Sequence, residues 1–167
     1  MATTLNGKVL FDFAETRNTG NWQVVNDGVM GGLSRGTFIP GETETAIFSG
    51  TVSLENNGGF SSVRYNTGKI EVEGFSILEL HLKGDGKKYQ VRIREKSSDY
   101  YSYIYTFETS GEWETVKITL AELYPSFRGR KLNFPNYQGN SMVEISFLIG
   151  NKKAESFRLE LQKALLK

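Results

Sequence analysis

The carboxylate of Asp27 lies in an unusually glycine-rich stretch, NDGVMGGLSRG at residues 26–36, where four glycines fall within nine positions. Such backbone freedom serves a loop that cradles phosphate, a turn between strands, or a loop that contacts a ligand or a partner. A phosphate loop needs Gly-Lys-Ser/Thr before a helix, and a dinucleotide loop needs Gly-x-Gly-x-x-Gly between a strand and a helix. The stretch has neither spacing, and the TFIPGE that follows has no helical pattern. Phosphate binding is therefore not predicted here.

The other reactive residue types do not form a recognisable catalytic or metal site. His81 is the only histidine and the chain has no cysteine, which excludes a zinc site of the usual composition. The sequence contains no 12-residue calcium loop and no Gly-x-Ser-x-Gly elbow. Its 19 acidic residues do not single out a pair for glycoside hydrolysis. We therefore predict no catalytic residue, no metal and no cofactor.

Two arginines fall where a strand would present them to a partner. Arg92 and Arg94 share the polar face of the alternating segment 89–95. One interpretation is a grid of exposed ion pairs with glutamates on neighbouring strands, each pair contributing about 0–1 kcal/mol. The other is a polar groove on a sheet face, for which the candidate residues are Glu79, Arg92, Arg94, Tyr100 and Glu160.

Two further arginines are candidates for loop contacts. Arg64 lies near the end of GFSSVRY, and Arg128 lies in the Pro- and Gly-bounded loop YPSFRGR. In such a loop an arginine either pins neighbouring loops together or meets a ligand. Both alternatives stay open for Arg128.

Aromatic residues are dense in the run YYSYIYTFE. Alternation places Tyr101, Tyr103, Tyr105 and Phe107 on the core side and leaves Tyr100 facing outward. Exposed rings of this kind serve as platforms for sugars, so Tyr100 belongs to the groove hypothesis. The two tryptophans of the chain, Trp22 and Trp113, are expected to anchor packing.

The elements that position these residues are predicted to be strands. Nine segments have alternating apolar and polar residues: KVLFDF, TAIFSGTVSL, GFSSVRY, FSILELHLK, YQVRIRE, YSYIYTFE, TVKITL, VEISFLIG and SFRLELQ. This pattern, with frequent turns, predicts an all-β fold of the β-sandwich or jelly-roll class with little helix. KGDGKK at 83–88 is predicted to be a hairpin turn, and only ITLAEL (118–123) and the tail QKALLK (162–167) suggest helical turns.

Composition narrows the function classes further. At 167 residues with 38% hydrophobic content, the chain is predicted to form one domain, residues 1–167. A net charge of +1 without a basic run gives no argument for nucleic acid. No apolar run of about 18 residues predicts a membrane-spanning helix. The start, MATTLNGKVLFDF, does not resemble a signal peptide, which predicts a cytoplasmic protein, or an organelle-matrix protein if a transit sequence has been removed.

Several blocks together resemble the complex I intermediate-associated protein family. They are VNDGVMGGLSRGTF after Trp22, AIFSGTVSLENNGGFSSVR, GDGKKYQVRIR, FETSGEWETVKITLAELYPSFRGR and a closing SFRLEL. They occur in the family's order and cover about residues 9–164. One departure is Asn26-Asp27, where the family often has Asp-Asp. The resemblance implies a galactose-binding-like jelly roll and a non-enzymatic role, since mitochondrial members assist assembly of the membrane arm of NADH:ubiquinone oxidoreductase.

Two functional hypotheses follow. In the first, the domain is a protein-binding assembly factor whose partners are respiratory complex I subunits or assembly intermediates. In the second, it is a carbohydrate-binding module that holds a glycan on a concave sheet face. We also predict that Asp27, Met30, Ser34, Arg64 and Arg128 cluster near one edge of the sandwich, where they either contact a ligand or partner or lock the loops together. In this cluster Asp27 would pair with Arg64 or Arg128, and Gly31 and Gly32 would allow either a positive φ or a close backbone approach.

Overall fold

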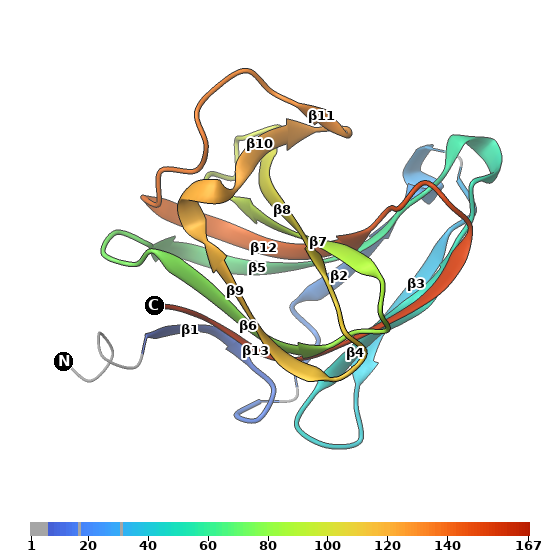
Figure 1. Ribbon diagram of the computed structural model, residues 1–167, viewed down its shortest axis with the longest axis horizontal. Coiled ribbons are helices and arrows are strands. Elements are labelled where there is room, and N and C mark those ends of the chain that lie inside the picture. Colours follow the sequence, from blue (N-terminus) through green and yellow to red (C-terminus); the bar gives the residue numbers. More distant parts are fainter. Residues whose placement is uncertain (1–6, 17, 31) are drawn as a thin grey trace.

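The computed structural model describes residues 7–16, 18–30 and 32–167, apart from the side chains of Val29, Met30 and Asn57. Within these ranges thirteen strands form two antiparallel sheets, one of six strands and one of seven (Figure 1). Short 3-10 turns are the only helical elements of the described part: η1 (Asp27–Met30), η2 (Glu55–Asn57) and η3 (Leu120–Glu122). None of its helices is long or apolar enough to cross a membrane. The predicted all-β sandwich of the jelly-roll class is confirmed.

The first sheet is built around the long strand β13, which carries the end of the chain. Its order is β3-β4-β13-β6-β9, and β1 pairs with the last residues of β13. The strands are β1 (Lys8–Asp12), β3 (Arg35–Pro40), β4 (Ala46–Val52), β6 (Ile77–Lys83), β9 (Trp113–Thr119) and β13 (Glu155–Leu166).

The second sheet carries most of the arginines that the sequence singled out. Its order is β11-β10-β8-β7-β12-β5-β2. The strands are β2 (Trp22–Asn26), β5 (Ser61–Glu71), β7 (Lys88–Arg94), β8 (Ser102–Glu108), β10 (Tyr124–Phe127), β11 (Arg130–Lys131) and β12 (Ser141–Ile149). In Figure 1 the pair β10–β11 rises at the top of the molecule, across from the arm that carries η1 and η2.

Strand alternation decides which side chains enter the core between the sheets. In β7 the side chains of Tyr89, Val91 and Ile93 are buried, and those of Gln90, Arg92 and Arg94 face away from the core. The same parity buries Ile145, Phe147 and Ile149 of β12. Each fully buried large apolar side chain contributes roughly 1.5–3 kcal/mol. The core therefore fixes, by parity, which polar residues lie together on the outer face.

Trp22 ties the two sheets together at one end of the core, as predicted. Its ring stacks on Phe38 of the first sheet at 4.6 Å and on Tyr65 of the second sheet at 4.8 Å between ring centroids. Trp113 does not anchor packing, because its side chain is 48% exposed. The core placement of Tyr101, Tyr103, Tyr105 and Phe107 is confirmed.

Three local predictions differ from the structure. KGDGKK is not a hairpin turn, because it links β6 of the first sheet to β7 of the second. The tail 162–167 continues β13 and forms no helical turn. A register shift between Leu161 and Lys163 breaks strict alternation there, which is why the tail lacked a strand pattern. Strands β2, β3, β10 and β11 lie outside the nine predicted segments.

Candidate functional site

The carboxylate of Asp27 is the centre of a buried hydrogen-bond cluster. Asp27 is 2% exposed and begins η1 directly after β2. Its Oδ1 accepts a bond of 2.9 Å from the backbone N–H of Ser34, and its Oδ2 accepts one of 3.1 Å from the N–H of Phe60. The Ser34 hydroxyl and the Gly59 N–H also donate to Oδ2. We call Asp27, Ser34, Gly59 and Phe60 the Asp27 knot.

These hydrogen bonds keep the Asp27 carboxylate ionised inside the fold. Burial by itself would raise the pKa of Asp27, but the bonds from Ser34, Gly59 and Phe60 outweigh it and hold the pKa below its ordinary value. The knot joins three separate segments: η1, the residue before β3 (Ser34), and the two residues before β5 (Gly59 and Phe60). Its hydrogen bonds therefore hold these loops together.

Two glycines beside Asp27, one inside the stretch 26–36 and one beyond it, have a physical explanation. A Cβ on Gly32 would lie 2.3 Å from Cγ of Asp27, and one on Gly58 would lie 2.6 Å from its Oδ2. Such distances are far inside van der Waals contact, so glycine lets the backbone close around the carboxylate. Of the two roles predicted for Gly32, a positive φ or a close backbone approach, the structure shows the close approach. Gly31 and the side chain of Met30 lie outside what the structure describes.

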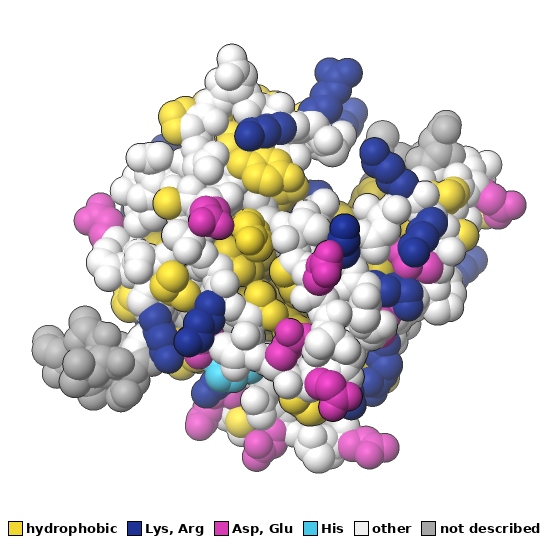
Figure 2. Space-filling view, viewed as in Figure 1, with side chains coloured by type: hydrophobic (Ala, Val, Ile, Leu, Met, Phe, Trp, Pro, Cys, Tyr) yellow, Lys and Arg dark blue, Asp and Glu magenta, His cyan; other side chains and the backbone are white. Residues whose placement is uncertain are grey.

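A groove of about 730 Å³ lies on the outer face of the second sheet. Figure 2 shows the surface hollowed between the part that carries β10 and β11 and the arm that carries η1 and η2. We call it the arginine groove. Its lining residues are Val25, Gly59, Phe60, Ser62, Arg64, Gln90, Arg92, Arg94, Tyr100, Ser102, Ser126, Phe127, Arg128, Gly129, Glu144, Ser146, Leu148 and Gly150.

The floor of the arginine groove is polar. In the strand register, Ser146 of β12 stands opposite Arg64 of β5 on one side and opposite Arg92 of β7 on the other. Arg92 donates from Nε and Nη2 to the side-chain oxygen of Gln90, at 3.0 and 2.8 Å. Arg94 faces Glu144 across the strands, with 3.9 Å between Nε and Oε1. The floor therefore holds guanidinium groups in a row with small side chains between them.

One rim of the arginine groove is aromatic. The ring of Tyr100 is 59% exposed and meets the ring of Phe127 edge-on, with 5.1 Å between centroids. Phe127 and Arg130 close a two-residue hairpin loop, and its residues Arg128 and Gly129 both have positive φ, of 50° and 78°. Such a turn matches the twist of the strands, but a positive φ is costly for arginine. The Arg128 guanidinium carbon lies 5.1 Å from the centre of the Phe127 ring.

The structure divides the first predicted cluster into two neighbouring pairs. Asp27 and Ser34 are bonded in the knot, whereas Arg64 and Arg128 line the arginine groove. Among the described residues no ion pair joins Asp27 to an arginine, so that predicted pairing is wrong. Three backbone N–H groups and the Ser34 hydroxyl donate to this carboxylate instead.

The second predicted set is also divided. Arg92, Arg94 and Tyr100 line the arginine groove together with Arg64 and Arg128. Glu79 and Glu160 do not line it, because they belong to β6 and β13 of the other sheet. There Glu79 pairs with His81 and Lys167, and Glu160 accepts a 2.7 Å bond from the Thr45 hydroxyl. The predicted grid of ion pairs is realised for Arg94 and Glu144.

Sequence reasoning missed several groove residues. They are Ser102, Ser126 and Ser146. Parity in β12 would have found Ser146, since it alternates with buried apolar residues. Ser126 lies on β10, a strand that the sequence pattern did not reveal.

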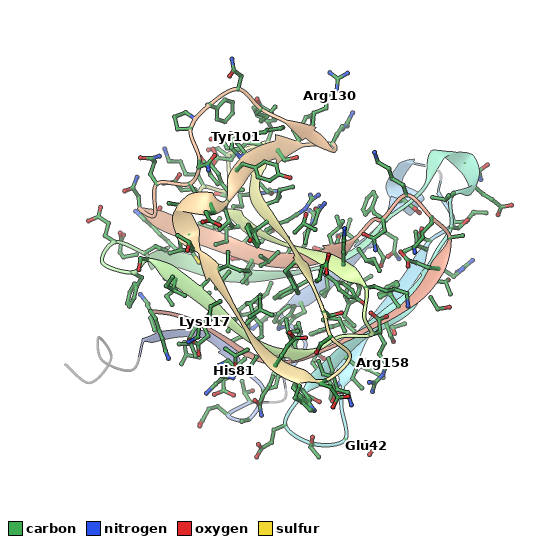
Figure 3. The ribbon with its side chains drawn as sticks, in the orientation of Figure 1. Glu42, His81, Tyr101, Lys117, Arg130 and Arg158 are labelled. Carbon is green, nitrogen blue, oxygen red and sulfur yellow. The ribbon has the colours of Figure 1, made fainter. Side chains whose placement is uncertain are left out.

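A smaller hollow of about 440 Å³ lies on the other sheet, beside the exposed ring of Trp113. His81 lines it, and its Nε2 is already 3.0 Å from Glu79 Oε1. Figure 3 shows His81 in the lower part of the molecule, far from Arg130 at the upper rim. This hollow is smaller than the arginine groove, and its histidine already has a carboxylate partner, so it is the weaker candidate.

Solved structures share this fold. A family 11 carbohydrate-binding module of the cellulosomal cellulase Lic26A-Cel5E of Clostridium thermocellum superposes with a TM-score of 0.69 and 17% identity, over 95% of this chain and 93% of that one. A family 11 module from the same organism, solved with a β-1,3-1,4-mixed-linked tetrasaccharide, has a TM-score of 0.65 and 15% identity, over 95% and 94% of the two chains. At these identities the likeness establishes the fold alone.

Sequence comparison identifies the family. The mouse (Mus musculus) protein named Complex I intermediate-associated protein 30, mitochondrial, is 25% identical over 181 residues, which cover 92% of this chain and 54% of the mouse protein. The chain thus spans about half the length of that relative. A family profile matches residues 11–161, which confirms the resemblance seen in the sequence. The chain belongs to the family described as Complex I intermediate-associated protein 30 (CIA30).

Proposed function

We propose that this chain is a non-enzymatic binding protein that acts as an assembly factor and contacts its protein client through the arginine groove. The observation that carries the proposal is the family match over residues 11–161. The groove supports it, because this hollow of about 730 Å³ includes Arg64 and Arg92, which have no carboxylate partner among the described residues. A surface of this kind suits recognition of a partner better than acid–base catalysis.

The client would be a subunit or an assembly intermediate of respiratory complex I, the NADH:ubiquinone oxidoreductase. The mouse relative takes its name from such intermediates. Because that relative is nearly twice as long, its whole activity is not expected from this chain alone. The protein would act in the compartment where the complex is assembled, which is the mitochondrion for the mouse relative.

An affinity purification from extract of the source cells tests this function. The bait is the tagged wild-type chain, with an Arg64→Gln, Arg92→Gln double variant as the groove test. Arg158→Gln is the matched control, since Arg158 is an exposed arginine on β13 of the other sheet (Figure 3). We expect complex I subunits with the wild type and the control, and their loss with the double variant. A wild-type bait that retrieves no complex I subunit would refute the assembly role.

A glycan is the second candidate, and one observation favours it. The arginine groove has an aromatic rim at Tyr100 and Phe127, and exposed rings are the usual platform for sugars. Calorimetric titration with a β-1,3-1,4-mixed-linked tetrasaccharide tests this alternative. Binding that is lost in Tyr100→Ala would move the conclusion to a carbohydrate-binding module, whereas the assembly function predicts no heat of binding.

A further inference from the structure

The arginine groove concentrates positive charge that the whole chain does not have. Its lining residues include four arginines and a single glutamate, whereas the complete chain has a net charge of +1. Clefts lined by one sign of charge focus the electrostatic field and attract ligands of the opposite sign. The local excess of positive charge therefore favours an anionic ligand, which the net charge of the whole chain did not suggest.

Two of the three arginines of the floor lack a carboxylate partner among the described residues, and the third has only a distant one. Among the described residues no carboxylate lies within ion-pair distance of Arg64 or Arg92, and Glu144 lies 3.9 Å from Arg94. The Nε of Arg94 is buried without a hydrogen-bond partner. A buried, unpaired donor costs free energy that a bound acceptor would recover. These groups are arranged as a receptor that is incomplete without an oxyanion.

The floor also has room for such a group. Arg64 and Arg92 flank Ser146 in adjacent strands, and strands lie roughly 4.8 Å apart, so the two arginine backbones stand about 10 Å from each other. Ser146 is short and buried between them, and within the described part of the chain its hydroxyl makes no side-chain hydrogen bond. A carboxylate above Ser146 would lie between two guanidinium groups and next to a free hydroxyl donor.

The electrostatics of Arg92 point the same way. Burial, together with the nearby charge of Arg64 and a smaller contribution from Arg94, lowers the pKa of Arg92 to about 10. An arriving carboxylate would relieve that like-charge repulsion. Guanidinium groups bind carboxylates with charge-assisted hydrogen bonds, which are about twice as strong as neutral ones.

We propose that the arginine groove binds an acidic peptide segment, with an Asp or Glu side chain of the segment placed over Ser146 between Arg64 and Arg92. The choice of a peptide rests on the proposed function, in which the partner is a protein. Asp and Glu are the side chains of an unmodified protein that are anionic at neutral pH. The exposed ring of Tyr100 on the rim would pack against the neighbouring residues of the segment.

Fluorescence anisotropy with a labelled peptide of alternating Glu and Ser tests the proposal on the full chain. The control peptide replaces every Glu with Gln. The wild type should bind the acidic peptide and not the neutral one, and binding should weaken as salt is raised from about 50 to 300 mM. Equal binding of both peptides, or no binding of the acidic one, would overturn the proposal.

An isosteric pair of variants locates the site. Ser146→Asp places a carboxylate of the chain itself between Arg64 and Arg92, and should weaken binding of the acidic peptide at least about tenfold. Ser146→Asn has the shape of Ser146→Asp without its charge, so it should bind the acidic peptide at least about fivefold more tightly than Ser146→Asp does. If both variants bind equally, the carboxylate position is wrong.

A second variant protects the test against misfolding. Arg64→Gln, Arg92→Gln should also weaken binding at least about tenfold, while Arg158→Gln leaves it unchanged. Near-ultraviolet circular dichroism confirms that each variant is folded. An oligogalacturonate is the acidic-glycan control. If it binds in an arginine-dependent way and the acidic peptide does not bind, the ligand is an acidic glycan and the choice of a peptide is overturned.

The failures of the two proposals can be told apart. If complex I subunits co-purify equally with the wild type and with Ser146→Asp, the assembly function stands and the acidic-segment inference falls. If the acidic peptide binds as expected but no complex I subunit is retrieved, the inference about the groove stands and the proposed client is wrong.

Discussion

The Asp27 knot and the arginine groove both remove ionised side chains from water, and they treat the charge in opposite ways. Asp27 receives hydrogen bonds from Ser34, Gly59 and Phe60, all within the chain. Arg64 and Arg92 face each other across Ser146 without a carboxylate between them. The charge of Asp27 is thus satisfied by donors within the chain, whereas the charges of Arg64 and Arg92 are left without an oppositely charged group among the described residues.

The difference separates a structural role from a binding role. A buried charge that is fully hydrogen-bonded holds segments in place, and a buried charge left unmatched is kept at a cost. The two regions are also connected, because Gly59 and Phe60 donate to Asp27 and line the groove. The knot therefore fixes the position of one wall of the groove, so the shape of the groove depends on the hydrogen bonds of Asp27.

The largest effect is expected from removing the carboxylate of the knot. Asp27→Ala leaves the backbone N–H groups of Ser34, Gly59 and Phe60 without their acceptor. Since an orphaned buried donor costs roughly 1–3 kcal/mol, the free energy of unfolding should fall by about 3–5 kcal/mol. Urea denaturation followed by tryptophan fluorescence measures the change. A loss below about 1 kcal/mol would mean that the knot is not the lock described here.

A smaller loss is expected when the backbone cannot close around Asp27. Gly32→Ala would place a Cβ 2.3 Å from Cγ of Asp27 and should cost about 2 kcal/mol, since side-chain overpacking typically costs about 1–3 kcal/mol. Gly28→Ala is the matched control, because a Cβ there meets no atom within 4 Å. The control should stay within about 0.5 kcal/mol of the wild type. Equal denaturation midpoints for the two variants would remove the close approach as the reason for glycine.

The knot should also appear in the pH dependence of stability. The pKa of Asp27 is lower in the folded chain than its ordinary value of 3.8, so between these two values the unfolded chain binds more protons. The stability from this carboxylate is fully present above the ordinary value and is lost as the pH falls through the folded value. Asp27→Asn should therefore flatten the acid side of the stability curve by up to about 1.4 kcal/mol per pH unit.

Glu79 provides the internal comparison for that measurement. Its pKa is also lowered, because hydrogen bonds and charge from His81 and Lys167 outweigh the raising effect of burial. Part of the acid sensitivity should therefore persist in Asp27→Asn and decrease further when Glu79→Gln is added. Unfolding free energies measured from about pH 6 to pH 3 test both statements. Parallel curves for the wild type and Asp27→Asn would show that Asp27 titrates alike in the folded and unfolded chains.

The fold was largely predictable because strand parity is a local property. The alternation in YQVRIRE identified the outward faces of Arg92 and Arg94 without any tertiary knowledge. Strands without that alternation were missed: β10 contains Pro125, and β11 is two residues long. The loop 83–88 was misassigned because a turn pattern does not show whether the chain returns to the same sheet.

The site was only half predictable, for a different reason. The arginines were visible as residue types, but which glutamates faced them depended on the sheet order. Glu79 and Glu160 fell on the other sheet, and Glu144 was the one that met Arg94. Ser34 was predicted to lie near Asp27, but the Gly59 and Phe60 partners of Asp27 were not, because backbone N–H groups carry no residue-type signature.

The smallest effect distinguishes the two regions most directly. If the arginines of the groove were structural, like Asp27, removing one would destabilise the chain. Arg92→Gln removes a half-buried charge that lies near Arg64, and Gln is able to accept or donate in its place. The free energy of unfolding should therefore stay within about 0.5 kcal/mol of the wild type or rise by up to about 1 kcal/mol. Urea denaturation beside Arg158→Gln, whose exposed ion pair with Glu160 contributes little, makes the comparison.

A loss of stability above about 1 kcal/mol for Arg92→Gln would mean that the arginines of the groove, like Asp27, stabilise the fold. An unchanged or higher stability, with weaker binding of the acidic peptide, would show that the chain keeps this charge for a partner.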